Sequence, residues 1–254
     1  MNILSFMVAL LAFHLLTPAI QANKQPQAAF TKVSNTEIHI HVLENWQAGS
    51  VVSEAAVKIF GEDKCFRSEA ISNSTFTRMR GKSYKEDCTT PRSELRYLRL
   101  LHYNGKGQIQ LGEMVCNKRI AQDLVNIFRS LYRQRYRIES MVLIDNYNAN
   151  DELSMQHNNT SCFNFRRIKG RAKLSKHSLG LAVDINPLYN PHVKKNSQGK
   201  QVVTPQCGIP YANRSKTFPY RIDHNDPCYK EFKKHGFRWG GAWTHSKDYQ
   251  HFEK

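Results

Sequence analysis

The chain has 254 residues, of which 40% are hydrophobic and 11% aromatic, and its 37 basic and 21 acidic residues give a net charge of +16. This apolar content excludes a wholly disordered chain, which would bury too little apolar surface to offset the entropy of ordering. Collagen and coiled coils are excluded because no Gly-X-Y or heptad repeat runs through the sequence. A polytopic membrane protein is excluded because the one long apolar run lies at the N-terminus.

The basic residues are spread along the chain and do not form one dominant block. A positive charge of this size predicts an anionic partner, for which cell-wall polymers, anionic lipids and nucleic acid are candidates. The alternative is a solvated basic surface without a partner.

An almost unbroken apolar run, Ile3–Leu16, opens the chain, and Ala19–Ala22 follows it. The small residue Ala22 suits cleavage before Asn23, so residues 1–22 are predicted to be a signal peptide. An uncleaved anchor helix is the alternative, but the run has 14 residues where a membrane span needs about 20. We therefore expect an exported protein, periplasmic or extracellular, with no membrane span after cleavage.

The chain has six cysteines but no Cys-x-x-Cys pair. The absence of such a pair argues against a zinc ribbon or a thioredoxin-like site. An even number of cysteines in an oxidising compartment permits disulfides. The pairs that we expect are Cys65 with Cys88 and Cys207 with Cys228, which enclose 22 and 20 residues. A loop of that size would contribute about 3 kcal/mol to stability. For Cys116 and Cys162, the alternative to a disulfide is that both are buried free thiols.

Residues 23–95 form an N-terminal extension that resembles no known pattern. Within it, residues 37–42 alternate between polar and apolar side chains, which predicts a short strand. His39 and His41 would then share one face, either as a metal clip or as the solvent face of an edge strand. Residues 61–95 are rich in Lys, Glu, Ser and Thr and are predicted to be irregular, with a disulfide between Cys65 and Cys88.

From about residue 96 to 254 the pattern indicates one domain. The sequence Asn104–Gly107 predicts a turn, residues 108–115 a strand, and Asn117 the cap of a helix over 118–135 with one apolar stripe. Further strands are expected at 141–144, 181–185, 237–239 and 249–253, with a long polar loop at 145–161 and a helix from Asp226-Pro227 to Gly236. Because no βαβ rhythm repeats, the fold class is predicted to be α+β.

Two segments carry the residues typical of a catalytic site. On the predicted strand 181–185, Leu181, Val183 and Ile185 face the core, so Asp184 is carried on the opposite side. His177 lies on the loop before this strand. The second segment, residues 239–253, places Asp248 and His251 three residues apart, after two glycines between tryptophans.

Two histidines and one carboxylate are a recurrent zinc-binding set in hydrolases. A further carboxylate beside the metal can accept a proton from water and deliver it to a leaving amine. His177, Asp184 and His251 supply the first set, and Asp248 supplies the second carboxylate. No His-Glu-x-x-His motif occurs, which excludes a thermolysin-like enzyme.

The sequence Ser-x-His-x-x-Gly-x-Ala-x-Asp at 175–184, with Asp-x-x-His at 248–251 after Trp-Gly-Gly-x-Trp, closely resembles the D-alanyl-D-alanine carboxypeptidase family of zinc peptidases. That family shares the fold of the hedgehog signalling domain, with a central, mostly antiparallel sheet flanked by helices. The form of these motifs is most similar to the branch that contains phage L-alanyl-D-glutamate endopeptidases. The resemblance extends from about residue 96 to the end.

The resemblance implies a role for each matching residue. His177, Asp184 and His251 would bind one catalytic Zn²⁺, and Asp248 would be the general base and acid. Arg166 would steady the substrate carbonyl and the developing oxyanion, with a structural ion pair as the alternative role. Ser175 would line the substrate site, with an ordinary turn hydroxyl as its alternative.

An independent argument favours Arg166 over Arg167: in an extended segment, Asn164 and Arg166 share a face and Arg167 points away. Members that cut D-Ala-D-Ala typically carry Glu where this chain has Asp248, which favours the endopeptidase branch.

The function we expect is an exported zinc peptidase that hydrolyses peptidoglycan stem peptides, with the L-Ala-D-Glu bond favoured. A D-Ala-D-Ala carboxypeptidase and a non-catalytic, zinc-containing cell-wall-binding module are the alternatives. Nucleic acid is not expected as a partner, because a nuclease would explain the charge but neither motif. A monomer is the default expectation.

Overall fold

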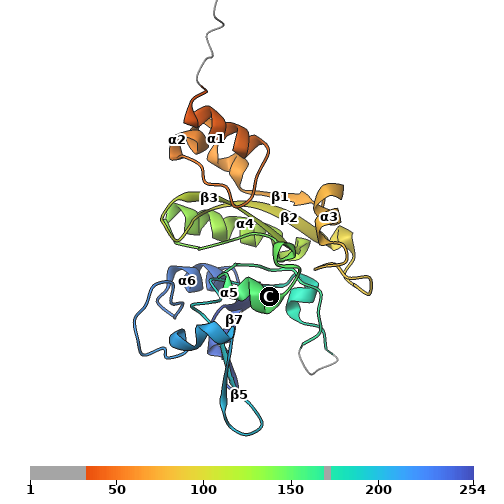
Figure 1. The fold of residues 1–254 in the computed structure, drawn as a ribbon, viewed down its shortest axis with the longest axis vertical. Helices are drawn as coiled ribbons and strands as arrows, with labels where there is room; N and C mark the ends of the chain where they lie inside the picture. The colour runs from red at the N-terminus through yellow and green to blue at the C-terminus, as the bar shows by residue number, and fades with distance from the viewer. Residues whose placement is uncertain (1–32, 169–172) are drawn as a thin grey trace, which may run out of the picture. The chain divides into compact units, whose positions relative to one another are not determined.

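The strands of the protein pair into three separate three-stranded antiparallel sheets in the computed structural model, which describes residues 33–168 and 173–254 (Figure 1). The named strands pair antiparallel and occur together with helices, which confirms the predicted α+β class. The expectation of one central sheet is wrong, because the later strands are two to four residues long and pair only within their own groups. The predicted signal peptide, residues 1–22, lies outside the described residues.

The first sheet contains β1 (Arg67–Ala70), β2 (Leu95–Tyr103) and β3 (Ile109–Asn117), in the order β1-β2-β3. The predicted turn joins β2 to β3, since the side-chain oxygen of Asn104 accepts hydrogen bonds from the backbone of Lys106 and Gln108. The predicted strand over 108–115 is thereby confirmed as β3. Residues 49–52 pair with the free edge of β3, through backbone bonds such as Gly49 N to Leu111 O (2.7 Å).

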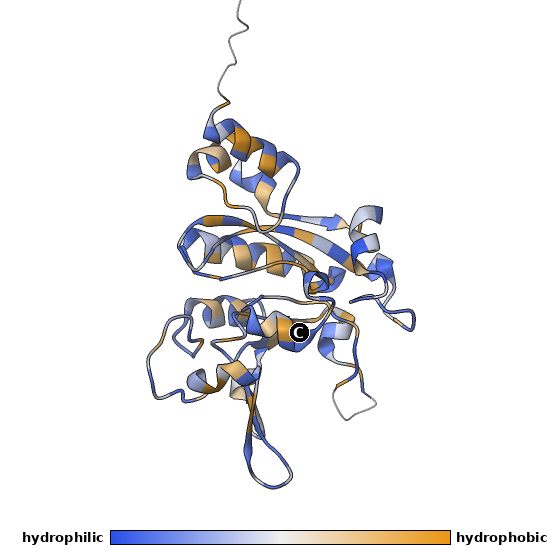
Figure 2. Cartoon of the chain, viewed as in Figure 1, coloured by the Kyte–Doolittle hydropathy of each residue, from blue (hydrophilic) through white to orange (hydrophobic). Residues whose placement is uncertain are grey.

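Helix α4 (Lys118–Arg133) packs on this sheet and confirms the helix predicted over 118–135. Asn117 caps it, as predicted, by accepting a hydrogen bond from Arg119 N. Helix α4 also packs on α6 (Pro227–Lys234), where Phe128 meets Phe232 edge to face. Figure 2 shows α4 banded with apolar and polar residues, as expected for a helix that is buried on more than one side.

The N-terminal part is more ordered than predicted. It holds α1 (Asn35–Glu44), α2 (Glu54–Phe60), the 3₁₀ turn η1 (Glu62–Cys65), α3 (Asn73–Met79) and η2 (Arg92–Glu94). The strand expected at 37–42 is wrong, because Ser34 and Glu37 form a reciprocal capping box that begins α1. Among the residues that the structure describes, His39 and His41 belong to no group that could hold a metal ion, and His39 Nδ1 accepts a hydrogen bond from Ser53 N.

The expected boundary between residues 95 and 96 does not separate two compact units. Residues 33–254 form one unit, because β1 from the supposed extension pairs along β2 from Arg67↔Arg99 to Ala70↔Arg96. In addition, the indole of Trp46 donates a hydrogen bond to Gly112 O on β3. The segment that the sequence left unassigned is therefore part of the same fold.

The C-terminal part is built from short elements. They are η3 (Ile144–Tyr147), α5 (Asp151–Gln156), η4 (Lys176–Leu179), β4 (Ala182–Asp184), β5 (His192–Lys195), β6 (Gln201–Thr204), η5 (Gln206–Tyr211), β7 (Arg238–Trp239), η6 (Gly240–Ala242), β8 (Ser246–Asp248) and β9 (His251–Glu253). They form the sheets β4-β9-β7 and β6-β5-β8. The hairpin β5–β6 extends from the rest of this part, and its tip is hydrophilic (Figures 1 and 2).

Five of the later predictions can be compared directly. The strands expected at 181–185, 237–239 and 249–253 correspond to β4, β7 and β9, and the helix that Asp226 caps is α6. The strand expected at 141–144 is wrong: Met141 O accepts a single backbone bond from Glu113 N, and Ile144 already begins η3.

The cysteines are free thiols, so the predicted disulfides Cys65–Cys88 and Cys207–Cys228 are wrong. In the first pair, each thiol donates to a backbone carbonyl within four residues of itself, which directs the two sulfurs to different places. In the second pair, Cys228 is buried on α6 while Cys207 is exposed in η5.

Among the described residues, no helix combines the length and the apolar character needed to cross a membrane.

Candidate active site

Three side chains predicted as metal ligands meet at one point. His177 Nε2 lies 3.2 Å from Asp184 Oδ2 and 3.2 Å from His251 Nδ1, and His251 Nδ1 lies 3.1 Å from Asp184 Oδ1. The two histidines are 5% and 6% exposed. Two nitrogen donors and one carboxylate within 4.8 Å of one another form a set that suits a borderline metal such as zinc, and they do not suit Ca²⁺ or Mg²⁺, which prefer oxygen ligands.

Backbone pairing fixes these three residues. Asp184 and His251 are directly opposite each other in the β4–β9 ladder, so their side chains share one face. The other edge of β4 is bonded to Ser161, through Asp184 N to Ser161 O at 2.9 Å. As the sequence predicts, Leu181, Val183 and Ile185 are buried on the opposite face.

His177 is placed by the turn η4, which ends at Gly180 in the left-handed region (φ +66°). A Cβ at Gly180 would lie 2.6 Å from Asn117 N. Only glycine therefore lets the turn approach the end of β3 so closely, and this approach sets the position of His177.

The remaining nitrogen of each histidine has its own acceptor. His177 Nδ1–H donates to Cys162 O at 2.6 Å, and His251 Nε2–H donates to Glu253 Oε2 at 3.3 Å. Glu253 in turn pairs with Arg238 at 2.8 Å. Such bonds fix the tautomer, so that the lone pairs of His177 Nε2 and His251 Nδ1 face the common centre.

The electrostatics of this centre favour a cation. Burial by itself raises the pKa of Asp184, but the charges of His177 and His251 and the hydrogen bonds with them outweigh burial and bring it well below its usual range. Burial lowers the pKa of His251, but hydrogen bonds to Asp184 and Glu253 outweigh it and raise the pKa to about 10. The carboxylates of Asp184 and Glu253 thus favour a proton on His251, and a metal ion at the centre would displace that proton and leave the Nδ1 lone pair free to bind it.

Asp248 faces the same cleft from β8. Burial raises the pKa of its carboxyl, and the charges of His192 and His251 partly offset that effect. A Cβ at Gly240 would lie 2.8 Å from Asp248 Cβ and 3.2 Å from His251 Cβ. The glycine in η6 therefore leaves room for the predicted base and the predicted ligand to stand side by side.

The two other predicted residues line the cleft with structural bonds of their own. Arg166 forms an ion pair with Asp151, and the Asn164 amide donates to the same carboxylate at 2.9 Å. Asn164 and Arg166 therefore share a face, as predicted. The ion pair with Asp151 is the alternative role that the sequence left open for Arg166. Ser175 caps η4, where its hydroxyl accepts a hydrogen bond from His177 N.

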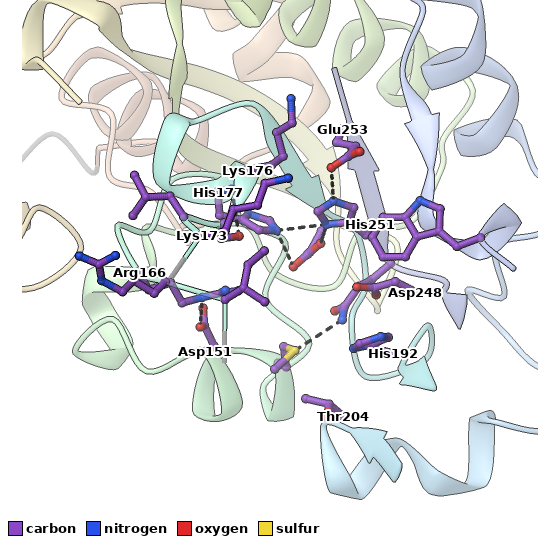
Figure 3. Close-up of a pocket in the computed structure, with 18 of the residues that line it drawn as sticks. Asp151, Arg166, Lys173, Lys176, His177, His192, Thr204, Asp248, His251 and Glu253 are labelled. Atoms are coloured by element: carbon purple, nitrogen blue, oxygen red, sulfur yellow. Dashed lines mark hydrogen bonds and ion pairs between the residues drawn. The ribbon is translucent and has the colours of Figure 1, made fainter. Parts of the chain in front are cut away.

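A cleft of about 600 Å³ surrounds the three converging side chains (Figure 3). Carboxylates lie near its centre, while its lining also carries the cations Lys173, Lys176, Lys194 and Arg238. Of the two tryptophans in the Trp-Gly-Gly-x-Trp motif, Trp243 lines the cleft and lies over His251 (ring centroids 5.3 Å apart), whereas Trp239 is buried in the core.

Four groups that line or support the site were not predicted from the sequence: Glu253, the Cys162 carbonyl, Asp151 and His192. Glu253 could have been found, because residues 251 and 253 share a face of a strand. A backbone carbonyl has no sequence signal, and Asp151 and His192 are brought to the cleft only by tertiary pairing.

Comparison with known proteins agrees with the geometry. The family model of D-alanyl-D-alanine carboxypeptidase matches residues 169–254. Over about a third of its length, the chain is therefore similar to that peptidase family. The match includes the three converging residues, Ser175 and Asp248, while Arg166 lies just outside it. No curated protein and no solved structure was found to match the chain.

Proposed function

We propose that the protein is an exported, zinc-dependent peptidase that hydrolyses peptidoglycan stem peptides, with the bond between L-Ala and D-Glu favoured. The observation that carries this proposal is the convergence of His177 Nε2, His251 Nδ1 and Asp184 in a cleft that Asp248 also faces. The peptidase family match over the same residues supports it. The resemblance of the motifs to phage endopeptidases supports the choice of bond.

Zinc held by His177, Asp184 and His251 would polarise a peptide carbonyl and make water acidic near neutral pH. The residues of the chain then divide the remaining work. Asp248 accepts the proton of the attacking water and returns it to the leaving amine. Burial raises the pKa of Asp248, which suits a group that must both accept and release a proton.

Arg166 and the cations of the cleft bind the substrate. The ion pair with Asp151 holds the guanidinium of Arg166 at the cleft wall, from which it can donate to a substrate carbonyl as negative charge develops. Stem peptides carry free carboxylates beside their scissile bonds, and Lys176, Lys194 and Arg238 offer positive charge to them. The exported location follows from the predicted signal peptide.

A non-catalytic wall-binding module is the alternative from another class. A structural zinc site is usually closed by four protein ligands, whereas a catalytic site has three and an open position. Here the converging group has three members and borders a cleft that contains a further buried carboxylate. These features favour catalysis.

The experiment is mass spectrometry of purified peptidoglycan after incubation with zinc-loaded protein of residues 23–254 and with the Asp248→Ala variant. We expect new fragments with free D-Glu amino termini from the wild type and at most a residual trace of them from the variant. Loss of terminal D-Ala alone would identify a carboxypeptidase instead. No cleavage by folded protein that binds zinc tightly would favour the binding module.

A further inference from the structure

Two polar atoms on one wall of the cleft are buried without a hydrogen-bond partner, and both belong to titratable side chains. They are Nε2 of His192 and Oδ1 of Asp248. Buried polar atoms in native proteins are nearly always paired, so an unpaired one calls for a functional explanation. Here two such atoms, one able to donate and one able to accept, occur in neighbouring strands.

The strand register brings these two residues together. His192 on β5 is directly opposite Asp248 on β8. Residues in this relation point to the same face, with Cβ atoms about 4.5–5.5 Å apart. On the other side of β5, His192 is opposite Thr204 of β6, and all three residues line the cleft. Figure 3 draws His192 between Asp248 and Thr204.

The charges agree with this pairing. Burial raises the pKa of Asp248, and His192 is the strongest of the neighbours that lower it. His192 is not one of the three residues that converge at the metal centre. It is therefore available to act on Asp248 without competing for the metal.

Gln250 offers a second acceptor, because its Oε1 is also buried without a partner, and its side chain also bonds to the Asp248 carboxyl, whose pKa it lowers less than His192 does. However, its amide nitrogen is directed to Met155 Sδ at 3.6 Å, and Gln250 lies outside the β5–β8 ladder. The register thus favours Asp248 as the partner of His192. Hydrogen bonds in metal-free and substrate-free sites are often long and tighten only when the reacting groups are bound.

We infer that His192 is a positioning residue for Asp248: its Nε2–H donates to Asp248 Oδ1 and fixes the carboxylate so that the second oxygen faces the attacking water. This inference rests on the proposed function, in which Asp248 is the base. It places the orienting partner of the base on the β5–β6 hairpin, outside both sequence motifs.

The test compares His192→Leu, which removes the donor, with His192→Gln, which keeps a side-chain N–H. His41→Leu, at an exposed histidine of α1, is the matched control. We expect kcat on a stem peptide to fall about 10- to 100-fold in His192→Leu, with little change in KM. His192→Gln should retain most of the activity, and the zinc content should stay equal in all variants.

Two readouts separate positioning from a structural effect. In His192→Leu, the acid limb of the kcat profile should move to higher pH, because the Asp248 carboxylate loses a group that favours its ionised form. In an Asp248→Ala background, the same substitution should not lower further the residual rate, which is measured at high enzyme concentration. Equal losses in both backgrounds would overturn the inference.

A measurement without turnover separates this inference from the proposed function. In ¹⁵N spectra of the histidine rings, we expect a hydrogen-bonded Nε2–H of His192 that Asp248→Ala abolishes. If Gln250→Leu abolishes it and Asp248→Ala does not, the inference is wrong. A wild type that shows this signal but cleaves no stem peptide would disprove the proposed function alone. A cleaving enzyme that is indifferent to His192→Leu would disprove the inference alone.

Discussion

A histidine can bind a metal through either ring nitrogen, and at this centre the neighbouring acceptors decide which one is offered. His177 presents Nε2 because its Nδ1–H is bonded to a backbone carbonyl, and His251 presents Nδ1 because its Nε2–H is bonded to Glu253. The motifs identified the side chains, but the ligand atoms follow only from these bonds. The tautomers are therefore set by residues that need not touch the metal.

The first prediction concerns Glu253. Glu253→Ala should weaken zinc binding about 10- to 100-fold, because His251 loses the acceptor that holds its ring. Glu253→Gln keeps an acceptor oxygen and should lose much less. The measurement is a competition titration against a chelating dye.

Arg238→Ala serves as the matched control, since Arg238 pairs with Glu253 from an exposed position and does not touch His251. Its effect on zinc affinity should be small. Equal losses in the Ala and Gln variants at position 253 would show that the charge of Glu253 matters and not its hydrogen bond.

Single elements were predictable where local signals agreed with tertiary packing. Helix α4 has a capping residue, Asn117, and an apolar stripe, and both are used in the structure. On strand β4, Val183 is fully buried while Asp184 is partly exposed to the cleft, as the sequence predicts. Asp184 and His251 lie on the predicted strands β4 and β9. His177 and Asp248 lie on η4 and β8, which were not predicted, and were identified by their spacing and by the resemblance of the motifs to the peptidase family.

Prediction failed where two local signals conflicted or where pairing came from distant residues. Residues 37–42 alternate like a strand, but the capping box at Ser34 and Glu37 starts a helix. Residues 141–144 are apolar enough for a strand, yet only one backbone bond reaches them from β3. The place of His192 depends on the register of β5 and β8, which no local pattern encodes.

Strand β2 carries a histidine whose burial predicts a pH-dependent stability. His102 is 2% exposed, its Nδ1–H donates to Ile138 O at 2.7 Å, and its Nε2 has no partner. Burial lowers the pKa of His102 from 6.5 to about 4. The folded state therefore binds fewer protons than the unfolded state between these two values.

The second prediction follows from the lowered pKa of His102. The contribution of His102 to the free energy of unfolding is fully present above pH 6.5 and is lost as the pH falls towards 4. The loss should reach about 3 kcal/mol. In His102→Asn, which keeps a donor for Ile138 O but does not titrate, this part of the pH dependence should vanish. Urea unfolding of both proteins at several pH values measures it, and parallel curves would contradict the assignment.

At the scale of the whole molecule, the family match and the fold do not have the same extent. The match covers residues 169–254, whereas the compact unit covers 33–254. Helix α4 connects the two parts, because it packs on β2 and on α6 at once. The site residues thus depend on a core that the sequence motifs do not contain.

The third prediction is that residues 96–254 alone do not fold, although the motifs begin after residue 96. Removing the preceding segment would strip β1 from β2 and residues 49–52 from β3, and would expose the surfaces that Leu43 and Trp46 cover. Unpaired strand edges and exposed apolar surface favour aggregation. We expect the fragment 33–254 to unfold cooperatively on heating and to bind zinc, and the fragment 96–254 to do neither. A cooperative transition in the shorter fragment, followed by circular dichroism, would show that residues 33–95 are an accessory extension after all.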